Sequence, residues 1–526
     1  MGTSTDRQEI ISTPEAKGMR LQPSARGLGV TLSTPSNHRK AVNAQPRQVG
    51  QHGIEDHASH LRWKAEAIDS TEAARALQLM QIDPESMEAG ATAETLRLPL
   101  FFSGFDNPEW ASPELQMAAG PRHLLVTVNN EFAVFDKTGC RLSRCDLANL
   151  FFPLTGAAAI SSPRVIYDQF REGWAVAACA RSEEGRRSWF LLAISQGDNP
   201  MGEWWIWALD AGQDGGVRTG HVADWLGLSV DPTSLYLTAN MYGGQGQFLY
   251  SKLRALNKKE LEEGAVLHGW DFWDLRNLDG SPAFSVQPAV NLRAAGVQYL
   301  LNTDNDGQGL TLWGFSHPPR QAPKLSRRFV PTVPYQLAPN ARQPKSGVRI
   351  DTGDTRLGNV VFRHGLLYTA HTIAANRGEE ENVAAIQWFQ INPRAGCVVQ
   401  QGVYGAPQAS YFAPAVMADG EGNMAMAFNR AGATECPSIR FTGRRASDEK
   451  NRLQASRQLN RGACTNKSDW SRFCGAAISP NDPEIWIIGQ YAPTEEDWAT
   501  WIGAVTFSHF EEEMASQFGK REFIVR

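Results

Sequence analysis

The segment RLGNVVFRHGLLYTAHT (356–372), followed by AAIQWFQIN (384–392), shows the pattern that decides the fold. One apolar run ends at Arg363-His364-Gly365, a second begins after it, and a third is rich in Trp and Phe. A polar turn with glycine between two short runs of β-branched and aromatic residues predicts a β-hairpin. The third run predicts a further strand of the same sheet.

The same order of runs and turns recurs along the chain at uneven spacing. A sheet of about four strands cannot bury both of its faces alone, but several such sheets can do so when they pack around an axis. The sequence therefore predicts an all-β protein, a β-propeller for which seven blades are favoured and six or eight also fit. The other groups are HLLVTVNNEFAVFDKTG (123–139), PRVIYDQFREGWAVAACA (163–180), ADWLGLSVDPTSLYLTANMY (223–242), PAVNLRAAGVQYLLNTDNDGQGLTLWGFS (288–316), YFAPAVMADGEGNMAMAFNRAG (411–432) and FCGAAISPNDPEIWIIGQYA (473–492).

The texture of the sequence changes near residue 95. Residues 1–95 are rich in Ser, Thr, Pro, Gln, Arg and Ala and have little apolar periodicity, which predicts a mostly disordered N-terminal arm. Within that arm, STEAARALQLMQI (70–82) has a capping serine and spaced apolar residues, so it predicts a short helix. We expect a single propeller domain over 96–510 and a C-terminal tail over 511–526.

Composition excludes some functions. The formal charge of −5 and the pI near 6.2 argue against nucleic-acid binding, which needs a basic surface. There is no run of about 18 apolar residues, so no transmembrane segment is expected. The N-terminus lacks the apolar core of a standard signal peptide. We therefore expect a cytoplasmic protein or one exported by a signal-independent route.

The seven cysteines form no CxxC pair, so no zinc site is indicated. Cys464 and Cys474 lie in one turn-rich segment and could pair in an oxidising compartment; isolated thiols are the alternative. One turn, NTDNDGQG (302–309), carries side-chain oxygens of the kind that bind calcium, although the same residues build ordinary tight turns. No other cofactor is indicated. The candidate metal ligands are Asp304, Asn305 and Asp306.

Several segments together resemble a large, uncharacterised family of bacterial β-propeller proteins, many of them secreted, with a distantly sialidase-like architecture. The resemblance covers about 100–508 and implies the fold rather than a chemistry. It has three departures: Ser162 stands where the family has an acid, Arg472 stands where it has a carboxylate, and the signal peptide expected of a secreted member is not seen. The segments are EFAVFDKTG (131–139), PRVIYDQ (163–169), LYLTANMY (235–242), DTGDTRLGNVVFRHGLLYTAHT (351–372), YFAPAVMADGEGNMAMAFNRAGATECPS (411–438) and WSRFCGAAISPNDPEIWIIGQYA (470–492).

A sialidase-like propeller would use arginines to hold a carboxylate, a Tyr–Glu pair as nucleophile and an aspartate as acid or base. Residues of these types lie near the ends of expected inner strands, but their spacing matches no defined glycosidase pattern. The alternative is that they form structural ion pairs between blades. The catalytic candidates are Arg356, Arg430, Tyr411, Glu435 and Asp168, and the ligand-binding candidates are Asp354, Arg356 and His371.

The favoured function is a binding protein that recognises a protein or a glycan through loops on one face of the propeller. No nucleophile elbow, zinc-protease, P-loop or dinucleotide-binding motif is present. The alternative is a sialidase-like glycoside hydrolase that uses an axial Arg/Tyr/Glu set. The sequence indicates neither a ligand nor an oligomeric state.

Overall fold

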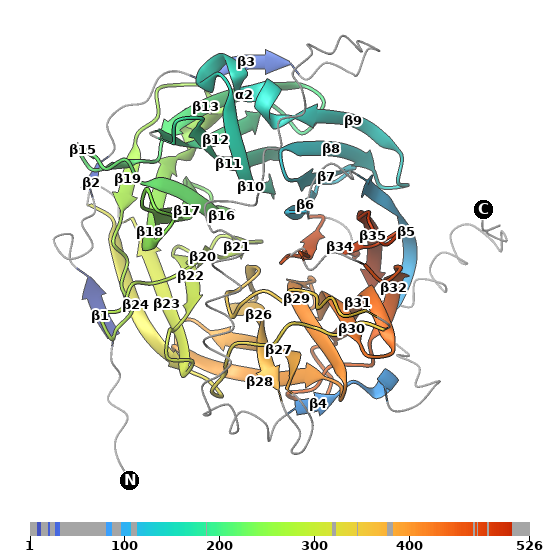
Figure 1. Cartoon of the computed structure of the whole chain (residues 1–526). Coiled ribbons are helices and arrows are strands. Elements are labelled where there is room, and N and C mark those ends of the chain that lie inside the picture. Colours follow the sequence, from blue (N-terminus) through green and yellow to red (C-terminus); the bar gives the residue numbers. More distant parts are fainter. Residues whose placement is uncertain are drawn as a thin grey trace.

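The protein is a seven-bladed β-propeller. The structure, a computed structural model, describes residues 8–11, 19–20, 27–31, 80–86, 96–106 and 113–507, with gaps at 186, 318–321, 345, 376–381, 466–468, 471 and 481–482. Within these residues, seven sheets of four to six strands stand in a ring around an axis (Figure 1). The predicted fold class and the favoured blade number are confirmed.

Each blade is a run of antiparallel strands that are mostly consecutive in the chain. Blade 1 contains β6 (Leu115–Ala119), β7 (His123–Val128), β8 (Glu131–Asp136) and β9 (Arg141–Asp146). Blade 2 contains β10 (Ala158–Asp168), β11 (Gly173–Ser182), β12 (Ser188–Ser195) and β13 (Glu203–Asp210). Blade 3 contains β16 (Val222–Val230), β17 (Ser234–Tyr242), β18 (Phe248–Asn257) and β19 (Gly269–Phe272). Blade 4 contains β20 (Gln287–Pro288), β22 (Gln298–Thr303), β23 (Gly309–Ser316) and β24 (Lys324–Pro331).

Blade 5 begins with a short parallel pairing between β21 (Val290–Asn291) and β25 (Val360–Arg363). It continues with β26 (Leu366–Ala375), β27 (Val383–Asn392) and β28 (Cys397–Gly405). Blade 6 contains β29 (Ala409–Ala418), β30 (Met424–Gly432), β31 (Glu435–Arg444) and β32 (Arg457–Arg461), and blade 7 contains β33 (Gly475–Ile478), β34 (Ile485–Tyr491) and β35 (Ala499–Thr506). Outside the blades lie β14 (Gln213–Asp214), β15 (Val217–Arg218), the helices α2 (Leu147–Thr155) and α3 (Lys258–Glu262), and the 3₁₀ turn η2 (Pro84–Ser86).

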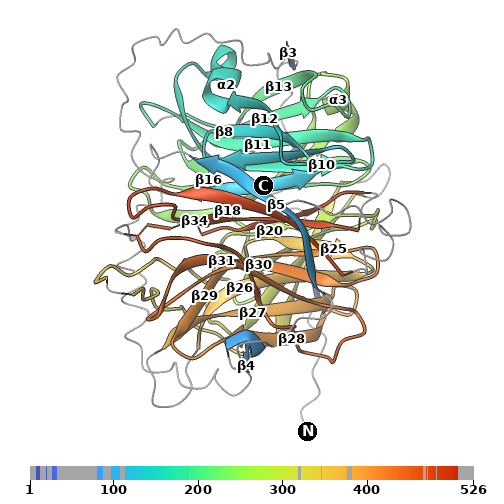
Figure 2. The ribbon, with the colours of Figure 1, turned by 90° about the vertical axis from the view of Figure 1, so that its right-hand side faces the viewer.

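A strand from before blade 1 closes the ring. β5 (Arg97–Asp106) pairs antiparallel with β35, and Phe102 lies opposite Ile502. Figure 2 views the ring from its rim, where β5 in blue lies against the red strands of blade 7. Both ends of the propeller domain therefore belong to the same blade.

Four further strands of the N-terminal segment add to the outer edges of blades (Figure 1). β1 (Gln8–Ile11) pairs with β24, β2 (Met19–Arg20) with β19, β3 (Leu28–Thr31) with β13, and β4 (Met80–Ile82) runs parallel to β28. These four short strands lie within the arm over 1–95 that the sequence predicts to be mostly disordered. Pairing at a sheet edge uses backbone groups, so short polar segments can form it without an apolar pattern.

The predicted helix over 70–82 is wrong at its end, because Met80–Ile82 is a strand. Residues 70–79, like the expected tail over 511–526, lie outside the described residues.

The core lies between neighbouring blades. Phe190 and Leu192 of blade 2, for example, pack in one buried cluster with Leu235 and Leu237 of blade 3. Burial of such apolar surface is the main stabilising term of the ring. None of the helices in the described ranges has the length and apolar character needed to cross a membrane.

Candidate functional site

Three inner strands carry the same irregularity near their first residues. The register with the second strand shifts after Ser161 in β10, after Asp224 in β16 and after Phe412 in β29. At each shift a residue other than glycine takes a positive φ, and these residues are Ser162 (52°), Trp225 (56°) and Ala413 (54°). Such bulges re-aim side chains and often lie at functional sites.

Five side chains from five blades form a stack across the axis at this end of the inner strands. The Arg164 guanidinium lies 4.8 Å from the Phe473 ring, and Phe473 stacks on Trp225 at 4.6 Å. On the other side of Trp225, the Arg356 guanidinium lies 3.8 Å from the Trp225 ring and 4.7 Å from the Phe284 ring. We call Arg164, Phe473, Trp225, Arg356 and Phe284 the axial stack. Cation–π contacts of desolvated arginines stabilise it.

Arg356 is held by its neighbour Asp354. Its Nε donates to both carboxylate oxygens of Asp354 at 2.7 Å, and Nη2 donates to Oδ2 as well. Both side chains are buried. The pair lies within one segment, which corrects the view of Asp354 and Arg356 as an ion pair between blades; Arg356 instead links blades through the two rings that it covers.

His371 supports the same segment from behind. One ring nitrogen lies 2.7 Å from the Thr355 carbonyl and the other 3.0 Å from Gln387 Oε1. The ring is fully buried, and burial lowers the pKa of His371. His371 therefore positions the Asp354–Arg356 segment and has no exposed nitrogen for a ligand.

The space at the axial stack is small. A pocket lined by Trp225, Asp354, Arg356, Ala413 and Arg472, among others, has a volume of about 20 Å³. That volume suits about one water molecule, and it is far below the several hundred Å³ of a typical small-molecule site. This pocket has no room for a sugar ring.

Three of the predicted catalytic residues do meet, but outside the axis. Arg430 donates from Nε to Glu435 at 2.6 Å and from Nη1 to the Tyr411 hydroxyl at 3.2 Å. Two acids of the N-terminal segment complete the cluster: Arg430 Nη1 lies 2.8 Å from Glu85, and Tyr411 donates to Asp83 at 3.0 Å.

The electrostatics of this cluster suit a structural role. Tyr411 is completely buried, and burial together with Asp83 raises its pKa, so the hydroxyl stays protonated. Burial disfavours the charge of Glu435, but Arg440 and Arg430 outweigh it and lower the pKa of Glu435. Arg440 also reaches Glu85 at 3.1 Å. The cluster fastens the N-terminal segment to blade 6.

The other two catalytic candidates, Arg356 and Asp168, lie apart from this cluster, so the five candidates of the alternative prediction do not form one set. Arg356 is in the axial stack. Asp168, at the end of β10, pairs at 2.7 Å with Lys258 at the start of α3, and both are buried. Burial of a charged group is tolerated when it is paired in this way.

The calcium candidates form the hairpin turn between β22 and β23. Asp304 Oδ1 accepts from the Thr311 hydroxyl at 2.5 Å, Asp306 Oδ1 accepts from Gln308 N at 2.9 Å, and Asn305 donates to the Pro282 carbonyl at 3.3 Å. Within the described ranges no group of three His, Cys, Asp or Glu side chains has the geometry of a metal site. Calcium binding at this turn stays a prediction.

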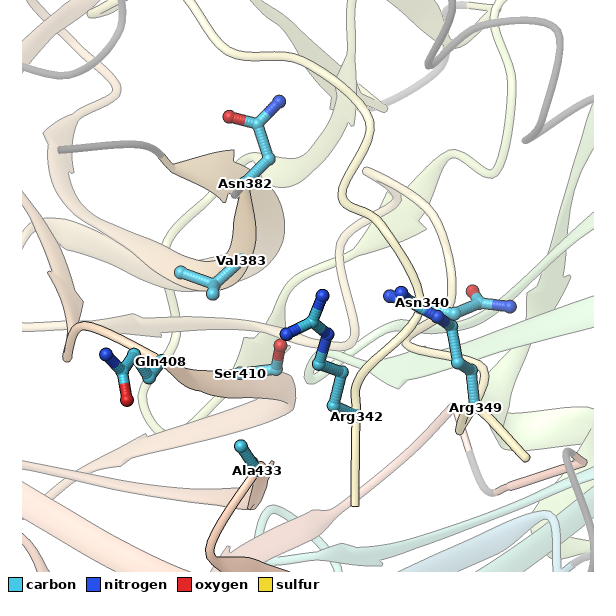
Figure 3. A pocket seen from close by; sticks show the side chains of 9 residues that line it. Asn340, Arg342, Arg349, Asn382, Val383, Gln408, Ser410 and Ala433 are labelled. Carbon is cyan, nitrogen blue, oxygen red and sulfur yellow. The ribbon is translucent and has the colours of Figure 1, made fainter. Parts of the chain in front are cut away.

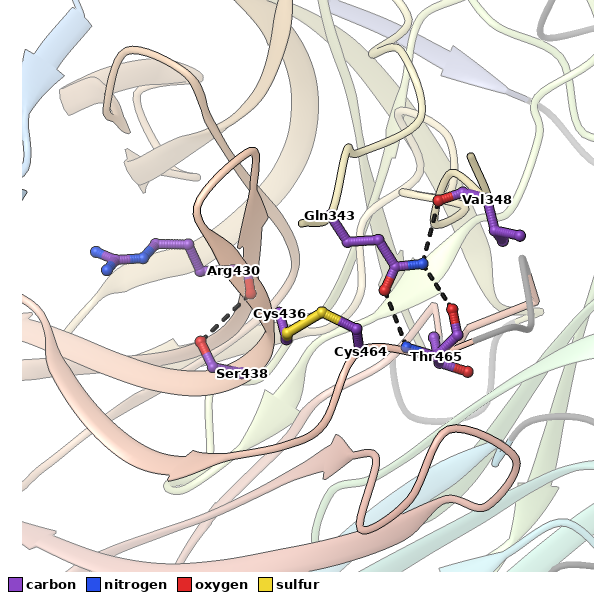
Figure 4. Close-up of a disulfide and its surroundings, with 7 residues drawn as sticks. All are labelled: Gln343, Val348, Arg430, Cys436, Ser438, Cys464 and Thr465. Carbon is purple, nitrogen blue, oxygen red and sulfur yellow. Dashed lines mark hydrogen bonds between the residues drawn. A yellow bond between two sulfur atoms is a disulfide. The ribbon is translucent and has the colours of Figure 1, made fainter. Parts of the chain in front are cut away.

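A disulfide joins Cys436 and Cys464, so neither the favoured view of isolated thiols nor the alternative pairing of Cys464 with Cys474 holds for Cys464 (Figure 4). Cys474 is buried and free, and burial raises the pKa of its thiol. Next to the disulfide, Gln343 donates to the Thr465 carbonyl at 2.7 Å and accepts from Thr465 N at 2.9 Å. The disulfide and Gln343 together anchor the loop that connects blade 4 to blade 5 in the chain.

That loop forms one wall of an open pocket of about 300 Å³, which we call the loop-face pocket (Figure 3). In Figure 3 the Arg342 side chain reaches from the loop toward the strands that carry Val383 and Ser410. Ser410 lines this pocket, and Ala413, on the same strand β29, lines the small pocket at the axial stack. The lining residues are Asn340, Arg342, Arg349, Asn382, Val383, Gln408, Ser410, Gly432 and Ala433.

A second open pocket, of about 380 Å³, lies at the outer strands of blades 3 and 4. Trp270 and His317 line it, and His268 is held there by Glu260, with 2.8 Å between His268 Nδ1 and Glu260 Oε1. Among the described residues that line it, Glu260 is the acidic group, and none is an arginine or lysine.

No family model matches the chain, and no curated protein matches it. Among solved structures, the quinohemoprotein alcohol dehydrogenase from Comamonas testosteroni aligns with a TM-score of 0.38 at 10% identity, over 78% of this chain and 67% of that chain. A Trypanosoma rangeli sialidase in complex with the inhibitor DANA aligns with a TM-score of 0.33 at 10% identity, over 68% and 56%. The GH43 endo-arabinanase from Bacillus licheniformis gives 0.27 at 10% identity, over 53% and 93%. The aligned region is thus little more than half of the sialidase.

Sequence reasoning missed most of these surroundings. Asp83 and Glu85 fall in a segment with no apolar pattern, and nothing local links them to blade 6. Trp225 and Phe473 lie in segments for which the sequence predicts only strands. Arg342 and Arg349 lie in a proline-rich segment (317–349) that predicts a crossing between blades or a cover on one face. The basic residues of this segment were the available signal for a binding surface.

Proposed function

We propose that the protein is a binding propeller whose loop-face pocket recognises an acidic glycan. The observation that carries the proposal is the lining of this pocket: two arginines stand with the amides of Asn340, Asn382 and Gln408 around an open volume of about 300 Å³. Function in propellers resides in loops at the blade ends, and this pocket lies on such loops.

The chemistry of the lining fits a sugar acid. A guanidinium pairs with a carboxylate through two parallel hydrogen bonds, which gives both affinity and orientation. Side-chain amides both donate and accept, so they can satisfy vicinal hydroxyl groups. A volume of about 300 Å³ lies at the lower end of small-molecule sites and suits one saccharide unit.

The positions of the catalytic candidates also favour binding over hydrolysis. Tyr411 and Glu435 lie in a buried cluster, and Arg356 lies in the axial stack, where there is space for about one water. A glycosidase needs two carboxyl groups on either side of an accessible glycosidic bond. The described residues offer no such pair in the loop-face pocket.

The test is a glycan array followed by calorimetry with the full chain. We expect binding to saccharides that carry a carboxylate, no binding to their neutral analogues, and a loss of at least about tenfold in affinity in Arg342→Ala and in Arg349→Ala. Arg452→Ala, which removes an exposed arginine outside the pocket, is the matched control and should bind as the parent does.

Two results would overturn the proposal. One is equal affinity in the parent and in both pocket variants, or binding only to acidic peptides. The other is turnover of a glycoside panel that is lost in Arg356→Ala, which would favour the hydrolase instead.

A further inference from the structure

The axis of the propeller contains a cavity next to the axial stack. Its volume is about 80 Å³, and its walls come from the inner strands of all seven blades. Gly358 lines both this cavity and the smaller pocket at the stack. We call it the axial cavity. Most of its walls are apolar side chains and backbone, but Arg164 and Gln287 also line it.

Arg164 is a buried cation without a paired carboxylate. Only 6% of the residue is exposed. Nη1 donates to the Pro163 carbonyl at 2.9 Å, the guanidinium faces the Phe473 ring, and Nη2 has no hydrogen-bond partner among the described residues. Burial lowers the pKa of Arg164 to about 10, so the side chain is still charged at neutral pH.

The acidic groups nearest to Arg164 are engaged with other donors. Glu114 accepts from Ser162 N at 2.6 Å, and Asp224 accepts from the Ser161 and Ser162 hydroxyls at 3.0 and 2.8 Å. Their charges favour the charged form of Arg164 from a longer range. Among the other buried arginines that the structure describes, Arg254 donates to Asp271 at 2.7 Å and Arg356 donates to Asp354. Arg444 donates to the backbone carbonyls of Arg452, Asp448 and Glu449.

A second buried donor lines the same cavity, two blades further along the ring. Gln287, from blade 4, is 5% exposed, and its Nε2 has no partner among the described residues. Buried donors without partners are rare in folded proteins and usually mark a bound water, an ion or a ligand. Two of them on one cavity, one of them cationic, favour an anion over water.

We propose that the axial cavity holds a small monovalent anion, a halide or a formate-sized carboxylate, bound by Arg164 and Gln287. The anion supplies the negative counter-charge that Arg164 lacks. A volume of about 80 Å³ accommodates such an ion but no sugar. This site is separate from the loop-face pocket, so the proposal does not depend on the glycan.

The experiment measures thermal unfolding of the full chain in gluconate buffer, with chloride or formate replacing gluconate at constant ionic strength. Binding to the folded state raises Tm, and we expect about 1–2 °C for each tenfold rise of either anion above its Kd. The rise should be absent in Arg164→Met and weaker in Gln287→Leu. Arg218→Met, an exposed arginine on β15, is the control and should respond as the parent does.

A second measurement does not depend on the variants folding. Crystals of the parent protein grown or soaked with bromide should show an anomalous peak beside Arg164 in the axial cavity. A cavity without that peak, or a chloride and formate response that is equal in the parent and in Arg164→Met, would overturn the proposal and leave water as the occupant.

Discussion

The Tyr411 hydroxyl donates a hydrogen bond to Asp83 over 3.0 Å, although the two residues are 328 positions apart in the chain. Asp83 also accepts from Ser456 N at 2.9 Å, so one buried acid ties the N-terminal segment to two parts of blade 6. Arg430 lies beside them with Glu85 and Glu435 as further partners. Tyr411, Glu435 and Arg430, which suggested a catalytic set, therefore hold the N-terminal segment against blade 6.

We expect Arg430→Met to destabilise the protein by about 3–5 kcal/mol, because it removes the cation among buried carboxylates. Tyr411→Phe should cost only about 1 kcal/mol, since one hydrogen bond is lost and the ring stays packed. Guanidinium unfolding measures both. Arg452→Met, at an exposed ion pair, is the control, and a cost in Arg430→Met no larger than in that control would contradict the fastening role.

The Asp354–Arg356 pair should behave as one unit. Arg356→Met removes both the ion pair and the two cation–π contacts, and we expect a loss of about 3–5 kcal/mol. Asp354→Asn keeps the shape but weakens the pair. In a double-mutant cycle the combined variant should cost less than the sum of the two, by about 1 kcal/mol or more. Strict additivity would mean that the two side chains stabilise the axis independently.

Reduction of the disulfide should weaken blade 6. Cys436 and Cys464 close a loop with a sequence separation of 28, for which loop-closure entropy predicts about 3–4 kcal/mol. Melting with and without reductant measures this, and Cys436→Ser should be insensitive to reductant. Cys397→Ser, at an exposed free thiol, is the control. Peptide mapping that finds Cys464 joined to Cys474 would contradict the structure.

Stability should depend on pH through Asp304. Burial raises the pKa of Asp304 to about 6 from its ordinary 3.8, and the Thr311 hydrogen bond only partly opposes this. The folded carboxyl keeps its proton to higher pH than the unfolded one, so its contribution falls as pH rises from about 4 to about 6 and is lowest above that range.

Asp304→Asn removes this loss. We expect the variant to gain about 1–2 kcal/mol over the parent at pH 7 and little or nothing at pH 4. Urea unfolding at a series of pH values gives the difference. Asp306→Asn removes the smaller contribution of the Asp306 charge to this shift, so it should keep most of the pH dependence of the parent. A profile of Asp304→Asn parallel to that of the parent would refute the assignment.

The blade pattern was readable because each blade repeats the same local signals. The predicted turn at Arg363-His364-Gly365 joins β25 to β26, and His364 and Gly365 take the positive φ values of 51° and 77° that a tight hairpin needs. The turn after Ala418 likewise joins β29 to β30. Such hairpins depend on neighbouring residues, which a sequence shows directly.

What the sequence missed depends on distant residues. Arg164, Trp225 and Phe473 come from three blades, and only the closed ring brings their side chains into one stack. Cys464 has Cys474 nearer in the chain, yet the strand pairing of blade 6 places Cys436 beside it. β1 and β2 pair through backbone groups, so their composition carries little information about where they lie.

The placement of the first strands has a consequence for how the chain is made. Gln8 lies opposite Arg328, and Phe102 lies opposite Ile502. During synthesis the N-terminal strands emerge first, yet their partners appear later: β13 in blade 2, β19 in blade 3, β24 in blade 4 and β28 in blade 5. Their backbone groups wait unpaired in the meantime, and the ring cannot close until β35 is complete. A chain that stops early therefore lacks a closed ring and leaves β5 open to proteases, so that folding itself distinguishes finished chains from unfinished ones.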